Sequence, residues 1–295
     1  MKKMQFRLWL CLSILTLSFL VLPAQKSKAA LAEATVQNAT TEGLFVTYQK
    51  GASTATRQLS GEASAVFQEA HSNAELQEIF RESSVQGASK SRNGLYLILR
   101  GTSGLESNAA AKAALQRAAG KWEYLIQDQI SVAVDVDFGA RFFDQVFPAN
   151  AVALTQAQGV RVTTGTLYER VIGRMRDNAT EERQKVLLNS LPDTSLPTDI
   201  GGADFVVLAS PIARAIGNLP ADADPNNPTE QAQGDLPAIG FNSAIKFDFD
   251  PSDGIDADKI DFEALATREL GRIIGFTSNT GSVELDAWRA TYLTV

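Results

Sequence analysis

Histidine and cysteine are almost absent from this chain of 295 residues, which contains one of each. The histidine is His71, so a metal site that needs three histidines is excluded by count. The cysteine is Cys11, and a single cysteine excludes an intramolecular disulfide and a cysteine-based metal site. Because Cys11 lies in the N-terminal apolar run, the mature chain is expected to have no thiolate nucleophile either.

The N-terminus has the features of a secretory signal peptide. Basic residues precede an apolar run from Leu8 to Leu22, and small residues suited to signal peptidase follow at positions 27–32. We assign residues 1–29 to this signal, which predicts a bacterial protein that is secreted to the periplasm or the outside of the cell. The run is short and no second span follows, so no stable membrane insertion is expected after cleavage. A retained N-terminal anchor is the alternative.

Basic residues are few compared with acidic ones. The chain has 27 lysines and arginines against 34 aspartates and glutamates. The signal peptide carries five of the basic residues and no acid, so its cleavage leaves 22 against 34, a net charge of −12. Such a charge disfavours nucleic acid and anionic membranes as partners, and no nucleic acid is expected.

Hydrophobic spacing predicts a domain with both helices and strands after a polar N-terminal segment at 30–92. Within that segment a short strand is predicted at 43–48 and a weak helix at 74–82. In residues 93–295 the predicted strands are 95–99, 130–138, 204–209 and one within 241–250. The predicted helices there are 108–126, 166–177 and 180–191.

The stretch from Ala266 to Ser278, with the sequence ATRELGRIIGFTS, is the most informative part of the chain. Residues before and within it have helical apolar spacing, and Asp258 is the expected N-cap with Gly275 as the expected end. In its centre, Glu269 is flanked by Arg268 and followed three positions later by Arg272. The pattern is therefore Arg-Glu-x-x-Arg on one helix.

This stretch resembles the active-site helix of secreted bacterial zinc metalloproteases of the zincin class, nearest to the matrixin-like metzincins. Their pattern is His-Glu-x-x-His, in which both histidines bind zinc and the glutamate is the general base. Glu269 stands in the glutamate position, whereas Arg268 and Arg272 stand where the histidines belong. Ser278 falls at the third ligand position of the longer signature. The resemblance is specific over residues 239–289 and looser over 93–210.

The resemblance implies an α+β fold: a zincin-like metalloprotease domain with a twisted mixed sheet, mostly parallel, packed on an N-terminal helix and on the active-site helix. That domain would be residues 93–295, and a longer relative would continue beyond Val295, so truncation at the C-terminus is left open. Residues 30–92 are then either a propeptide-like segment or an N-terminal elaboration.

Arginine at the ligand positions argues against zinc. A guanidinium is only a hydrogen-bond donor and stays protonated, so it cannot replace a histidine ligand. Zinc, the cofactor of the family, is therefore expected to be absent, with no metal held by Arg268, Arg272 or Ser278. Without zinc, the water that Glu269 would activate has no reason to ionise near neutral pH. We expect a metalloprotease homologue that has lost hydrolysis, with peptide or protein segments as its partners.

Two other functions are compatible with the sequence. One is an active metallopeptidase that uses carboxylates such as Glu269 and Asp286 as ligands. The other is a non-enzymatic surface module that binds calcium through the acidic loop Asp248–Asp261, although this loop fails the EF-hand template. Whether the protein is an enzyme is thus left open.

Three hypotheses concern single side chains. Arg272 can pair with Glu269, three positions before it on the helix. The two arginines are either satisfied by nearby acidic residues or bind an anion, carboxylate or phosphate, in the former metal cleft. His71 is predicted to lie on the surface.

Overall fold

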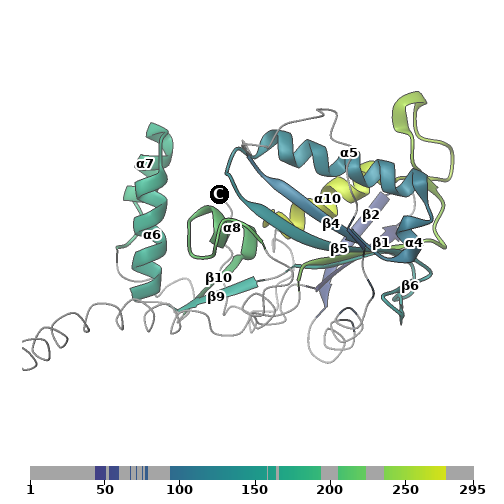
Figure 1. Cartoon of the computed structure of the whole chain (residues 1–295), viewed down its shortest axis with the longest axis horizontal. Helices are drawn as coiled ribbons and strands as arrows, with labels where there is room; N and C mark the ends of the chain where they lie inside the picture. The colour runs from purple at the N-terminus through teal and green to yellow at the C-terminus, as the bar shows by residue number, and fades with distance from the viewer. Residues whose placement is uncertain are drawn as a thin grey trace, which may run out of the picture. The chain divides into compact units, whose positions relative to one another are not determined.

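A seven-stranded mixed sheet forms the framework of the protein, in the order β2-β1-β8-β11-β5-β4-β3. Figure 1 labels four of its strands, β1, β2, β4 and β5. This computed structural model describes residues 44–50, 53–59, 67, 71, 75, 77–78, 94–157, 159–163, 166–193, 205–223 and 236–276. The strands of the sheet are β1 (Leu44–Lys50), β2 (Ser53–Leu59), β3 (Gln77–Glu78), β4 (Tyr96–Gly101), β5 (Ser131–Gly139), β8 (Ala151–Gln156) and β11 (Ala238–Asn242).

The sheet is mixed, but the expectation that it is mostly parallel is wrong. Among the described strands, the parallel pairings are β4 with β5 and β5 with β11, while β8, β1, β2 and β3 are added by antiparallel pairing. A parallel pair needs a long crossover, which α5 (Ala109–Leu125) supplies between β4 and β5. The antiparallel strands β1, β2 and β3 come from residues 30–92. The sequence alone favours a propeptide-like segment or an N-terminal elaboration for these residues.

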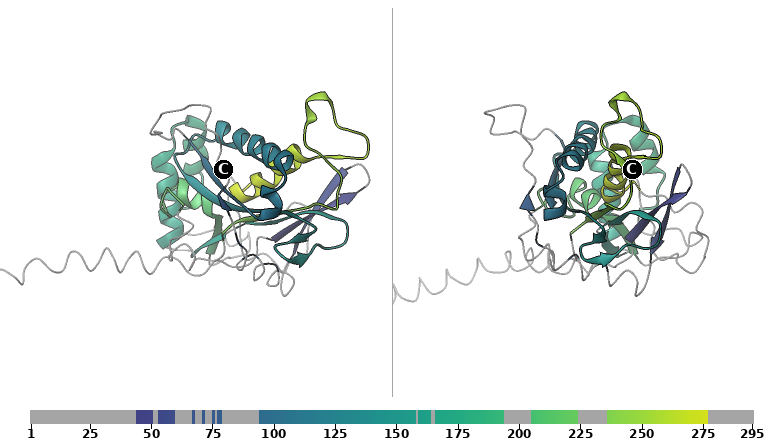
Figure 2. Two further views of the ribbon diagram at one scale, coloured as in Figure 1. Left: turned by 45° about the vertical axis from the view of Figure 1, so that its right-hand side comes forward. Right: turned by 90° about the vertical axis from the view of Figure 1, so that its right-hand side faces the viewer.

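Two helices cover one face of the sheet. α5 and α10 (Phe262–Ile274) pack against each other on the same side of it (Figures 1 and 2). α5 forms as its spacing predicts: Asn108 caps it by accepting a hydrogen bond from the Ala111 amide, and its apolar stripe is buried. The stripe and the helix-facing residues of β5 meet in one core: Ala111, Ala114, Leu115, Ala118, Ala119, Val132, Val134, Val136 and Phe138. The α+β class is therefore confirmed.

The other face of the sheet carries a second apolar cluster. Leu44 and Val46 of β1 and Leu154 of β8 pack there against Phe67 and Phe142. A Cβ on Gly240 of β11 would lie 2.3 Å from the Phe142 ring, so only glycine lets this ring lie against the strand. Residues of the N-terminal segment are thus part of the same packed structure as the strands of the predicted domain.

Smaller elements complete the described structure. The helices α6 (Thr166–Asn178) and α7 (Glu182–Asn189) lie where the sequence predicts them. The strand predicted at 204–209 is β10, and it pairs with β9 in a separate two-stranded sheet. The further elements are α4 (Ser103–Glu106), β6 (Arg141–Phe142), β7 (Gln145–Val146), β9 (Gly159–Thr163), β10 (Phe205–Ala209), α8 (Ser210–Ala215), β12 (Phe247–Asp248), the 3-10 helix η2 (Pro251–Asp253) and β13 (Ile260–Asp261).

Two local predictions in the neighbourhood of these elements are wrong. The N-cap of α10 is Asp261, whose side chain accepts from the Ala264 amide, and Asp258 instead has a positive φ of 62° in a turn. Gln77–Glu78 form strand β3 within the stretch predicted to be a helix, because β4 offers an antiparallel partner. Gly275 does end α10, with φ 110° in the left-handed region that glycine adopts at low cost.

Gly271 on α10 should be harmed by alanine even though alanine favours helices. A Cβ at Gly271 would lie 2.7 Å from Cζ2 of Trp122, whose Nε1 donates to the Thr267 carbonyl at 2.7 Å. We expect Gly271→Ala to lower the free energy of unfolding by about 1–3 kcal/mol, as overpacking does. Gly120→Ala on α5 is the matched control, because no described residue outside its own helical turns lies within 4 Å of its Cβ position.

The control should be neutral or raise the free energy of unfolding by up to about 1 kcal/mol, the helix-propensity gain. Urea unfolding of both variants measures the difference. A stabilised Gly271→Ala would show that the helix α10 does not pack on Trp122 as described.

Candidate functional site

The side chain of Glu269 points from α10 into the sheet and is completely buried, with 0% of its surface exposed. The hydroxyl of Thr47 on β1 donates to its Oε1 at 2.8 Å, and that of Thr155 on β8 donates to its Oε2 at 2.8 Å. Side chains alternate between the faces of a strand, so both threonines share the face that α10 covers. The carboxylate is thereby fixed to two strands far from it in sequence.

Both arginines turn to the same carboxylate. Arg268 donates from Nε and Nη2 to Oε1 at 3.2 and 3.1 Å, and Arg272 donates from Nη1 to Oε2 at 2.7 Å. The pairing of Arg272 with Glu269 follows the i, i+3 spacing that the sequence indicates. With the two bonds from the threonines included, Glu269 accepts five hydrogen bonds. We call Arg268, Glu269 and Arg272 the Arg–Glu–Arg cluster.

Threonines of the edge strand β2 hold the outer ends of the guanidinium groups. Arg268 Nη1 donates to Thr54 Oγ1 at 2.6 Å, and Arg272 Nη2 donates to Thr56 Oγ1 at 2.6 Å. Arg272 also lies over the Phe45 ring, 5.6 Å from its centre, which adds a cation–π contact. The sequence reasoning missed these threonines, although their alternation in STATRQL gave a signal that one face of the strand is polar.

The cluster carries one more positive than negative charge. Burial lowers the pKa of the Arg272 guanidinium, Glu269 opposes this effect, and Arg268 adds to it. Arginine nonetheless remains charged in proteins. The side chain of Arg272 is 12% exposed and that of Arg268 is 37% exposed, so solvent near Arg268 screens the excess charge. Of the two hypotheses for the arginines, the structure favours pairing with an acidic residue, and Glu269 serves both.

Zinc does not fit this site. The atoms that Arg268 and Arg272 present are protonated donors already directed at oxygen, and a metal needs lone pairs. Over the residues that the structure describes, no group of three or more His, Cys, Asp or Glu could hold a metal ion. Ser278 and Asp286 lie outside the described residues, as do the predicted signal peptide and residues 277–295 in general.

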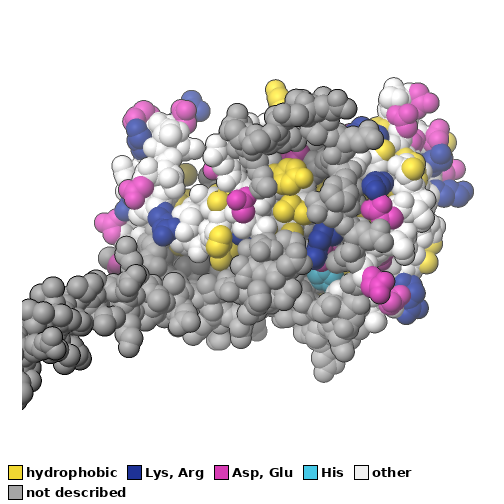
Figure 3. All heavy atoms as spheres, in the orientation of Figure 1, with side chains coloured by type: hydrophobic (Ala, Val, Ile, Leu, Met, Phe, Trp, Pro, Cys, Tyr) yellow, Lys and Arg dark blue, Asp and Glu magenta, His cyan; other side chains and the backbone are white. Residues whose placement is uncertain are grey.

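His71 is buried, with 4% of its surface exposed, so the prediction of a surface position is wrong. Its Nε2 lies 2.6 Å from Oδ2 of Asp135 on β5, and its ring packs against Phe143. Arg100 of β4 donates to both oxygens of the same aspartate at 2.6 and 2.7 Å. This second polar group fixes a residue of the N-terminal segment to the face of the sheet that is turned away from α10. Figure 3, in which histidine is cyan, shows only a small part of this side chain.

The acidic loop uses its carboxylates to hold its own backbone. Asp248 accepts from the amides of Asp250 and Asp256 at 3.0 and 2.8 Å, and Asp250 accepts from the Ser252 amide at 3.2 Å. Asp256 is paired with Lys259. These contacts account for much of the acidic run, and no observation in the described loop favours calcium over them.

Acid should loosen this loop. The backbone amides of Asp256 and Asp250 hold the pKa of Asp248 below its usual value. A lowered folded-state pKa gives stability that is present above the unfolded pKa, about 3.9, and is lost as the pH falls through the folded value. Asp248→Asn removes the charge and one acceptor, so it should be less stable than the wild type at pH 7. Its deficit should narrow as the pH falls below about 4. Urea midpoints from pH 3 to 7 test this, and a deficit that stays constant would refute it.

Comparisons with known proteins assign no family to this chain. A scan against protein-family models gave no match, and searches of curated proteins and of solved structures found none. The resemblance to metalloproteases therefore depends on the residues quoted from the sequence. A separate finding is that no helix among the described residues is long and apolar enough to cross a membrane.

Proposed function

We propose that the chain is a secreted, non-catalytic homologue of the zincin metalloproteases, in which the Arg–Glu–Arg cluster takes the place of the zinc site. The geometry of Glu269 carries the proposal. A general base needs a free lone pair within hydrogen-bond reach of a water or substrate. Both oxygens of Glu269 already accept from a hydroxyl and a guanidinium, and the side chain has no exposed surface.

The arrangement of the helices supports the zincin part of the proposal. The motif lies on one helix, α10, which packs beside α5 on a single face of a mixed sheet. Such an arrangement is what the resemblance implies for the active-site and N-terminal helices. Glu269 also points at the sheet from the position that the pattern assigns to the general base.

The proposed role of this scaffold is to bind peptide or protein segments. β2 lies at one edge of the sheet among the described strands, and its residues from Thr54 to Leu59 are exposed or half-buried. An extended peptide can add to such an edge by main-chain hydrogen bonds. The half-exposed Arg268 lies beside this strand and would favour segments with an acidic side chain.

A proteolysis assay tests the loss of catalysis. The mature protein is incubated with an unfolded protein substrate, with and without added zinc, and with a chelator. We expect no cleavage under any of these conditions, and the same null result for Glu269→Gln. Cleavage that zinc stimulates, the chelator removes and Glu269→Gln abolishes would contradict the proposal and favour the active metallopeptidase with carboxylate ligands.

A further inference from the structure

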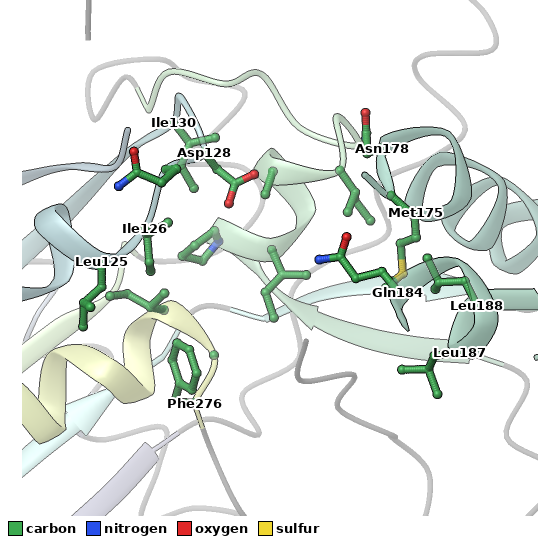
Figure 4. Close-up of a pocket in the computed structure, with 18 of the residues that line it drawn as sticks. Leu125, Ile126, Asp128, Ile130, Met175, Asn178, Gln184, Leu187, Leu188 and Phe276 are labelled. Atoms are coloured by element: carbon green, nitrogen blue, oxygen red, sulfur yellow. The ribbon is translucent and has the colours of Figure 1, made fainter. Parts of the chain in front are cut away.

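An apolar groove of about 540 Å³ opens between the C-terminal ends of α5 and α10 and the helices α6, α7 and α8 (Figure 4). Its walls include Leu125 and Ile126 from the end of α5, Met175 of α6, and Leu187 and Leu188 of α7. Leu125 and Leu187 at its rim are 65% and 63% exposed. None of the three residues of the Arg–Glu–Arg cluster lines this groove, and neither do the threonines that contact them.

The chain itself enters this groove where α10 ends. α10 ends in a left-handed turn at Gly275, and the Phe276 amide donates back to the Gly271 carbonyl at 2.9 Å. The Phe276 ring stacks on Trp122 with their centres 5.0 Å apart, and it forms part of the groove wall. Residues 277–295 therefore continue from a point on the rim.

The sequence of 277–295 suits an apolar groove. After six polar or small residues, apolar side chains recur at Leu285, Trp288, Tyr292 and Val295, spacings of three, four and three. This is the spacing of the anchors that an amphipathic helix places in a groove. The tail also carries Arg289, and the groove has one acidic side chain in its wall, Asp128.

We propose that residues 277–295 of the same chain occupy this groove, with Trp288 as the main anchor and Arg289 near Asp128. Tethering to the rim favours the tail over free partners, because a short linker gives an effective concentration of about millimolar. The six residues from Thr277 to Ser282 act as that linker. The tail thus covers apolar surface on α5 and α7 that is otherwise exposed to water.

The fluorescence of Trp288 tests the proposal in the full mature chain. Subtracting the spectrum of Trp288→Phe from that of the wild type isolates the emission of Trp288. We expect this emission to be blue-shifted and protected from acrylamide. In Leu187→Asp and in Leu125→Asp, which change exposed groove residues and should fold, it should shift to the red and become readily quenched.

Val146→Asp is the matched control, because Val146 is 65% exposed and does not line the groove. It should leave the Trp288 emission unchanged. A Trp288 that acrylamide quenches freely in the wild type would overturn the proposal. So would protection that both groove variants leave intact, or protection lost on dilution, which would place the tail in a second copy of the chain. None of these outcomes depends on zinc or proteolysis.

Discussion

Replacing Glu269 by alanine is expected to lower the free energy of unfolding by about 3–5 kcal/mol, the usual result of removing one partner from a buried ion pair. The variant leaves two guanidinium groups without their shared carboxylate and frees the hydroxyls of Thr47 and Thr155. Arg272 is the more affected of the two arginines, because less of its side chain reaches solvent.

The direction of this change separates the two roles that Glu269 could have. Catalytic residues are often held in arrangements that cost stability, so removing one is frequently neutral or stabilising. Removing a residue that anchors the structure instead lowers the free energy of unfolding. Glu269→Gln keeps the shape but not the charge, and it should fall between the wild type and Glu269→Ala.

Urea unfolding at neutral pH measures the difference, with Glu182→Ala as the control. Glu182 pairs with Lys185 on the exposed surface of α7, and its loss should change the free energy of unfolding by no more than about 0.5 kcal/mol. A Glu269→Ala variant as stable as this control would show that the Arg–Glu–Arg cluster does not hold α10 to the sheet.

Phe262→Ala should have a comparable effect, about 3–5 kcal/mol, for a different physical reason. Phe262 is fully buried at the start of α10, and its ring lies 4.7, 5.2 and 5.0 Å from those of Phe241, Phe247 and Phe249. Alanine leaves a cavity among aromatic rings that cannot all collapse into it. Tight packing in protein interiors makes such a void costly.

Tyr124→Ala provides the comparison for Phe262→Ala. Tyr124 is an aromatic residue on α5 with 82% of its surface exposed, so its removal should stay within about 0.5 kcal/mol of the wild type. Both are measured by the same denaturant titration. A loss below about 1 kcal/mol for Phe262→Ala would mean that the start of α10 is not packed as described.

Features set by residues close in sequence were predictable. The apolar stripe and Asn108 cap of α5 are contained in one segment, and so is the Arg272–Glu269 spacing on α10. The left-handed end at Gly275 follows from the conformational freedom of one residue. In each case the deciding interaction spans only a few positions.

Features set by distant residues were not predictable in the same way. Thr47 and Glu269 are 222 positions apart, and no local pattern links a threonine on β1 with a glutamate on α10. His71 was misplaced because its partner, Asp135, is 64 positions away on a central strand. The prediction of a mostly parallel sheet was wrong for the same reason, because β1 pairs with β8, a strand about 100 positions later in the chain.

The zinc content of the purified mature protein tests the central claim most directly. Elemental analysis after dialysis against metal-free buffer gives the number of zinc ions per chain. The Arg–Glu–Arg cluster leaves no lone pair for a metal, so we predict a value near zero. A value close to one zinc per chain, retained through dialysis, would contradict the structural role of Glu269. It would favour the alternative of an active metallopeptidase with carboxylate ligands.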